Sequence, residues 1–115
     1  MANRSKGEVS VTFRGQAINL AMTFNVICAI EDAFDQPIED AMARFDDQGG
    51  QKKLSMRDMR VLFHQLLIYG MPDASQEDAG DLIEEIGMQA AGKLLEQIMA
   101  RSMIASEGNK ARPPA

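Results

Sequence analysis

The chain has 115 residues, of which 45% are hydrophobic and 25% are charged, a composition typical of a globular protein with one domain. A formal net charge of −5 argues against a nucleic-acid-binding protein, whose surface is basic, and the single cysteine excludes an intramolecular disulfide. No signal peptide is recognisable, and no apolar run approaches the ~20 residues that a transmembrane helix needs. We therefore expect a cytoplasmic protein that binds neither nucleic acid nor membrane.

Residues 7–22 predict a β-hairpin, because apolar and polar side chains alternate in two short runs. The alternating apolar residues are Val9, Val11 and Phe13 in the first run and Ile18, Leu20 and Met22 in the second. Arg14, Gly15 and Gln16 lie between the runs and supply the glycine that a tight turn requires. An isolated hairpin is marginally stable in water, so we expect its apolar face to pack on helices or on another copy of the chain.

Residues 23–46 predict two helices. Thr23 resembles an N-cap for the first, which runs from about residue 24 to residue 34. Its inward face is expected to hold Phe24, Ile27, Ile30 and Phe34. Pro37 disfavours the helical conformation at the residue before it and so ends this helix. Pro37 also suits the first turn of a short second helix that closes near Asp46.

A polar segment with two glycines, residues 46–53, precedes a third helix. Ser55 followed by Asp58 resembles its capping signal, and Gly70 is expected to be its C-cap. The wide apolar surface of this helix holds Met59, Leu62, Phe63, Leu66, Leu67 and Tyr69. We therefore expect the third helix to lie at the centre of the core.

Serine and glycine mark the limits of a fourth helix. Ser75 is expected to be its N-cap, with acids in the first turn as the helix dipole favours, and Gly87 ends it. A fifth, apolar helix is expected from about Met88 to Ser106.

Together these elements predict an α+β fold in which an N-terminal β-hairpin is followed by a bundle of about five helices. The single domain is expected to span residues 7–106, with the hairpin at 7–22 and the helical part at 23–106. We expect residues 1–6 to form a flexible N-terminus. Residues 107–115, which have little apolar content and two prolines, are expected to form a disordered tail.

The stretch NVICAIEDAF holds the only cysteine, Cys28, and so raises the question of thiol chemistry. A nucleophilic thiol needs an electropositive, partly exposed setting and a base within reach. Cys28 instead has apolar neighbours and is followed by Glu31 and Asp32, whose negative charges disfavour a thiolate. We expect Cys28 to lie in or near the core and both acids to face solvent. Whether Cys28 faces the core of its own domain or a neighbouring subunit is left open.

No other set of side chains indicates an enzyme or a cofactor site. The only histidine, His64, has no second histidine or cysteine with which to share a metal. The acidic cluster at residues 78–85 lacks the Glu-x-x-His spacing of a dimetal carboxylate site, and no glycine-rich nucleotide-binding loop is present. We predict a non-enzymatic protein that carries no metal and no cofactor.

Charge is distributed unevenly along the chain. Residues 31–47 carry seven acids and one base, residues 73–85 carry six acids and no base, and residues 51–60 carry four bases and one acid. Such runs are mostly solvated helix faces, although patches of opposite sign also steer a partner or a second copy.

Methionine is unusually frequent, with nine in the chain. Those on or beside the last three predicted helices are Met56, Met59, Met71, Met88, Met99 and Met103. Because methionine is adaptable, these residues either fill the core or form a groove that binds an apolar helical segment of a partner.

Three blocks of sequence, taken together and in this order, resemble a known family. They are NRSKGEVSVTFRGQAINLAMTFNVICAIEDAFDQPI, RVLFHQLL and SQEDAGDLIEEIGM, the last followed by an apolar helix. Over residues 3–105 the chain resembles the gene transfer agent family of small phage-tail proteins, which is grouped with the tail assembly chaperones of long-tailed phages and prophages.

The resemblance implies a tail assembly chaperone without enzymatic activity. Such a protein binds the tape-measure protein and keeps it soluble while tail tube subunits, a further possible partner, polymerise around it. The residues expected to contact the partner are Met88, Leu95, Ile98, Met99 and Met103. The alternative is a structural minor tail component that stays in the particle. A homo-oligomer and a longer, frameshifted form are left open.

Overall fold

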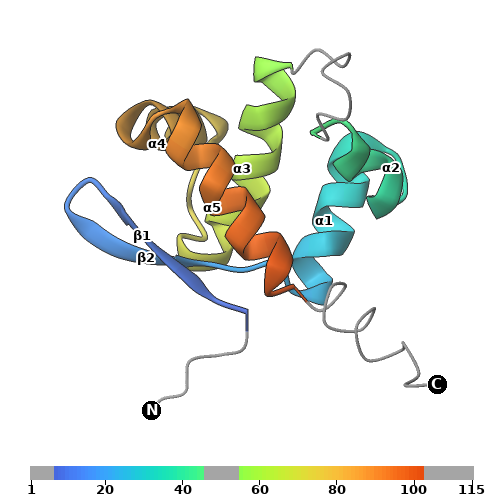
Figure 1. The fold of residues 1–115 in the computed structure, drawn as a ribbon, viewed down its shortest axis with the longest axis horizontal. Helices are drawn as coiled ribbons and strands as arrows, with labels where there is room; N and C mark the ends of the chain where they lie inside the picture. Colours follow the sequence, from blue (N-terminus) through green and yellow to red (C-terminus); the bar gives the residue numbers. More distant parts are fainter. Residues whose placement is uncertain (1–6, 46–54, 103–115) are drawn as a thin grey trace.

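The computed structural model describes residues 7–45 and 55–102 (Figure 1). In this part of the chain an antiparallel two-stranded hairpin is followed by five helices, which confirms the predicted α+β fold. The elements are β1 (Val9–Phe13), β2 (Gln16–Leu20), α1 (Phe24–Phe34), α2 (Ile38–Ala43), α3 (Met56–Gly70), α4 (Gln76–Ile86) and α5 (Met88–Ala100). The predicted flexible N-terminus, the polar segment at 46–53 and the predicted tail at 107–115 lie outside the described residues.

The hairpin closes through a two-residue turn. Phe13 lies opposite Gln16, and both turn residues, Arg14 and Gly15, have positive φ angles of 53° and 79°. Positive φ at both central positions is the geometry whose twist matches that of paired strands. The apolar face of the hairpin is buried against helices, with α3 packed on β2 and α5 on β1 (Figure 1).

The helix α3 is the central helix, as predicted, because it contacts β2, α1 and α4. Its N-cap is Ser55, whose Oγ accepts a hydrogen bond from the N–H of Asp58 at 3.2 Å. The largest fully buried side chains of the described residues are Phe13, Leu20, Met22, Ile30, Leu62, Phe63, Leu66, Leu67, Leu82 and Ile98, together with Ser102. The core therefore lies between the hairpin, α1 and the last three helices.

Gly70 is the last residue of α3 and not the C-cap that we predicted; the C-cap is Met71. Glycine is required here for another reason. A Cβ at this position would overlap the carbonyl oxygen of Asn19 and would lie 2.9 Å from Cγ2 of Ile18. The end of α3 therefore lies against the backbone of β2, at a distance that leaves no room for a side chain.

The prediction for α1 is right in its limits and wrong in part of its face. Thr23 caps the helix by accepting a hydrogen bond from the N–H of Val26 at 3.2 Å. Ile27 and Ile30 are buried, but Phe24 is 63% exposed. Phe24 is the first residue of α1. Helical spacing gives the face on which a side chain lies, but it does not show how far along the helix another element covers that face.

The prediction that Glu31 faces solvent is wrong, because this residue is half-buried. Its carboxylate accepts a hydrogen bond from the N–H of Ile38 at 2.8 Å, so it caps the first turn of α2, where an anion is favourable. α2 ends at Ala43, earlier than the predicted closure near Asp46, which lies outside the described residues.

The last two helices begin and end largely as predicted. Ser75 and Asp78 form a capping box at the start of α4, and Gly87 lies between α4 and α5 with a φ of 92°. α5 ends at Ala100, and Arg101 and Ser102 are not helical, so the predicted continuation to Ser106 is wrong at these two residues; residues 103–106 lie outside the described residues. No helix among the described residues is long and apolar enough to cross a membrane.

Candidate functional site

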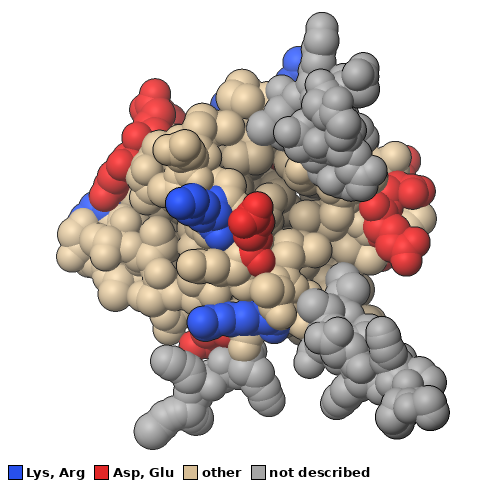
Figure 2. Space-filling view, in the orientation of Figure 1, with Lys and Arg blue, Asp and Glu red and all other residues tan. Residues whose placement is uncertain are grey.

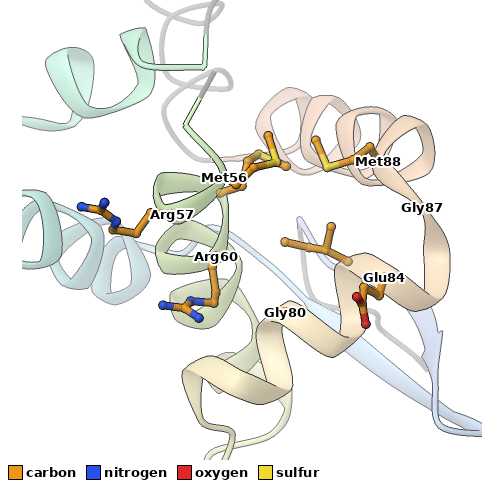
Figure 3. Close-up of a pocket in the computed structure, with 9 residues that line it drawn as sticks. Met56, Arg57, Arg60, Gly80, Glu84, Gly87 and Met88 are labelled. Carbon is orange, nitrogen blue, oxygen red and sulfur yellow. The ribbon is translucent and has the colours of Figure 1, made fainter. Parts of the chain in front are cut away.

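A groove of about 550 Å³ opens between the start of α3, the second half of α4 and the start of α5 (Figure 3). Its lining residues are Met56, Arg57, Met59, Arg60, Gly80, Ile83, Glu84, Gly87 and Met88. The volume lies within the range of about 300–1,000 Å³ that is usual for ligand-binding clefts. The groove is therefore large enough to receive several side chains of a partner.

Exposed methionine side chains give the groove its apolar character. Met56 is 57% exposed and Met88 is 41% exposed, and the only other large hydrophobic side chain exposed in the described residues is Phe24. Met56 and Met88 approach each other at one end of the groove, although they come from α3 and α5 (Figure 3). An apolar surface left open at the junction of three elements is typical of a docking site.

Two glycines keep the groove open. Gly80 lies inside α4, and a Cβ there would meet only Cδ of Arg60, at 3.6 Å. Gly87 forms the corner between α4 and α5, and its φ of 92° favours glycine. A Cβ at position 80 would therefore make only an ordinary van der Waals contact with a side chain.

The two sides of the groove carry different charges. Arg57 and Arg60 extend from α3, and Glu84 extends from α4 (Figure 3). Asp58, which lies between the two arginines in sequence, is bound by Arg44 at 2.9 Å. Within the described part of the chain, no ion pair engages Arg57 or Arg60, so the α3 side of the groove presents positive charge.

Acidic side chains dominate elsewhere. Figure 2 shows them gathered over α4 and over α2, at opposite edges of one face of the molecule; between these edges a basic and an acidic side chain lie next to each other, and another basic side chain lies below them. The groove thus provides a local basic edge on a chain whose formal net charge is −5.

The residues predicted to contact a partner do not form one surface. Met88 lines the groove, whereas Leu95 and Ile98 are buried in the core. Met99 is half-buried, and Met103 lies outside the described residues. Partner contact by these residues stays a prediction; of the four that the structure describes, Met88 alone lines the groove.

Sequence reasoning missed the contribution of α4 to the groove. The signal was present, because Gly80, Ile83, Glu84 and Gly87 are spaced by three, one and three residues and therefore share one helix face. The sequence does not show which helices lie next to this face of α4, and so it could not predict the groove.

Cys28 is exposed, so its predicted place in or near the core is wrong. It lies on the outer side of α1, one position after the buried Ile27. His64 lies on α3, where Nε2 is 2.9 Å from the carbonyl oxygen of Ala74. Because a carbonyl only accepts, Nε2 carries the proton, and the imidazole links α3 to the segment before α4.

The acidic cluster of α4 binds the hairpin turn. The Arg14 guanidinium lies 3.1 Å from Asp78 and 2.7 Å from Asp81. The backbone N–H of Arg14 donates to both carboxylate oxygens of Glu85, each at 3.2 Å. The N–H of Ser75, followed by Arg14, lowers the pKa of Asp78. No group of three or more His, Cys, Asp or Glu residues in the described ranges is arranged to hold a metal ion.

These features describe a small α+β protein whose candidate site is an apolar groove with a basic edge. A sequence model of the family described as phage tail tube protein, GTA-gp10, matches residues 6–103. The chain therefore belongs to this phage-tail family, which confirms the resemblance to gene transfer agent tail proteins. Neither a curated protein nor a solved structure matches the chain.

Proposed function

We propose that this protein is a tail assembly chaperone that binds the tape-measure protein, in the cytoplasm, while a phage-type tail is built. The observation that carries the proposal is the methionine-lined groove, since a chaperone must offer apolar surface to a client. Methionine suits this task because its unbranched, polarisable side chain adapts to varied apolar partners. The role requires binding alone, and we propose no enzymatic activity.

The second candidate is a structural component that stays in the tail, and the description of the family as a tail tube protein favours it. A tube built as a β-barrel needs many strands, whereas the described residues contain two. This difference is the reason for preferring the chaperone. For the chaperone, we propose the tail tube protein as a further partner.

Co-expression with a tape-measure protein from the same genome tests the proposal. We expect the two proteins to co-purify and the tape-measure protein to become more soluble. The absence of both effects would refute the chaperone role.

Mass spectrometry of purified particles separates the two candidates. A chaperone is expected to be absent from mature tails. Stoichiometric recovery of this chain from them would support the structural component.

A further inference from the structure

We infer that the groove binds an amphipathic α-helix of the partner, with its apolar face on the methionines and an acidic flank along Arg57 and Arg60. This inference rests on the proposed function only for the identity of the partner. The chemistry of the occupant follows from the groove itself.

The spacing of the lining residues favours a helical occupant. α4 contributes positions 80, 83, 84 and 87, and α3 contributes positions 56, 57, 59 and 60. Residues three and four apart form the ridges of a helix surface, and a groove between two such ridges fits the ridge of a third helix. An extended strand would instead require an open sheet edge, and none of the lining residues belongs to a strand.

The floor of the groove requires apolar side chains from the occupant. Of the apolar lining residues, Met59 is 3% exposed and Ile83 is half-buried, whereas Met56 and Met88 are exposed. Flexible methionines at the rim adapt to the spacing of the incoming side chains, whereas the buried Met59 fixes the base. A helix that presents two or three large apolar residues on one face would cover this floor.

The charges select the flank of that helix. Arg57 and Arg60 are exposed, and the nearest acid in sequence, Asp58, is held by Arg44. Glu84 lies on the opposite side of the groove, from which it repels a second acidic flank (Figure 3). An occupant with acids on one side only is therefore accepted in one orientation.

A second copy of the chain fits the groove less well. Outside the groove, the only large hydrophobic side chain exposed in the described residues is Phe24, on α1. One aromatic ring would leave most of the apolar floor uncovered. We therefore assign the groove to a different protein.

Two designed peptides test the assignment. Each has about 15 residues, the length at which an isolated helix begins to form, and leucines on one face. One carries glutamates along one flank, and the other carries lysines at the same positions. We measure their binding to the full chain by fluorescence anisotropy and expect the glutamate peptide to bind about tenfold more tightly, with a difference that shrinks in high salt. Equal affinity of the two peptides would overturn the charge assignment.

A groove-filling variant tests the place of binding. Gly80→Leu puts a side chain into the groove and favours the helical state of α4, so we expect a folded protein that has lost at least about tenfold in peptide affinity. Gly92→Leu is the matched control, because Gly92 is an exposed glycine of α5 with no atom within 4 Å of its Cβ position. Unchanged binding by Gly80→Leu would place the peptide elsewhere. If this variant does not fold, Met56→Gln and Met88→Gln change exposed side chains and are expected to show the same loss.

Charge reversal tests the orientation. The double variant Arg57→Glu and Arg60→Glu is expected to prefer the lysine peptide. Lys93→Glu makes the same kind of change at an exposed residue of α5 outside the groove and is expected to leave the preference unchanged. A double variant that still prefers glutamate would contradict the assignment of these arginines.

Sedimentation velocity at two protein concentrations tests the second copy. If the protein self-associates, and if both Gly80→Leu and the glutamate peptide prevent this, the groove binds another copy of the chain and the inference is overturned. Failure of the groove and failure of the proposed function remain distinguishable. If the tape-measure protein still co-purifies with Gly80→Leu, the groove assignment is wrong and the chaperone role stands. If the peptides behave as expected but the tape-measure protein does not bind, the chaperone role is wrong.

Discussion

Replacement of Gly70 by alanine should destabilise this protein, although helix propensity alone predicts the opposite. The added Cβ would overlap the carbonyl oxygen of Asn19 and lie 2.9 Å from Ile18 Cγ2. To restore an ordinary C···O separation of about 3.3 Å, α3 and β2 must move apart by on the order of 1 Å. Both elements belong to the packed core, so neither moves freely.

The magnitude follows from two opposing effects. Overpacking of this kind costs about 1–3 kcal/mol, and the change from glycine to alanine in a helix returns about 0.5–1 kcal/mol. Because backbone must shift at position 70, we take the upper part of the first range and expect a net loss of about 1–2 kcal/mol. For a small domain this lowers the Tm by about 5–15 °C.

Urea denaturation followed by circular dichroism measures this loss. The matched control is Gly92→Ala, at a helical glycine with open space around it, which should gain about 0.5–1 kcal/mol. If Gly70→Ala were as stable as the native protein, or gained stability as Gly92→Ala does, the close approach of α3 to β2 would be refuted. An unchanged m-value shows that the mutation acts on stability and not on the compactness of either state.

Three further predictions concern the hairpin turn and the thiol. Arg14→Ala should lower the Tm at low salt, and thermal unfolding near 1 M salt should show a smaller difference, because exposed ion pairs are screened; an equal loss at both salts would assign the effect to the turn conformation. The lowered pKa of Asp78, due first to the N–H of Ser75 and then to Arg14, means that its stabilisation is complete above its unfolded-state pKa of about 4 and is lost as the pH falls through its folded-state value. Denaturation at several pH values should therefore show the advantage of the native protein over Asp78→Asn shrinking below about pH 4, whereas a constant difference would contradict the linkage. Cys28 should react with a thiol reagent in the folded protein, and Cys28→Ser should change the free energy of unfolding by no more than about 0.5 kcal/mol; a thiol that reacts only in denaturant would return it to the core.

Short-range signals in the sequence predicted most of the fold. The alternation of Val9, Val11 and Phe13 predicted a strand, and the structure has β1 at those residues. Ser55 and Ser75 predicted two helix starts, because a serine cap binds an N–H three residues ahead and needs no distant partner. Each of these signals lies within one turn or one strand, which is why it can be recognised without a fold.

Predictions that depended on a distant neighbour were the ones that were wrong. Helical spacing placed Phe24 on the inward face of α1, and apolar sequence neighbours placed Cys28 in or near the core, yet both are exposed. The sequence pattern gives the angle of a side chain around its helix and does not say which angle another element covers. Glu31 shows the same limit, because its role as a cap of α2 depends on how the chain turns after α1.

The sequence by itself determined the order of elements, the N-caps Thr23, Ser55 and Ser75 and the phage-tail family, since these depend on local pattern and on matching residues. Only the tertiary structure decided the groove. It brings Met56 and Met88 together from α3 and α5, opens the space over Gly80 and leaves Arg57 and Arg60 without an acidic partner among the described residues. No local pattern encodes this site, because its surface exists only where three helices that are separate in sequence have packed against one another.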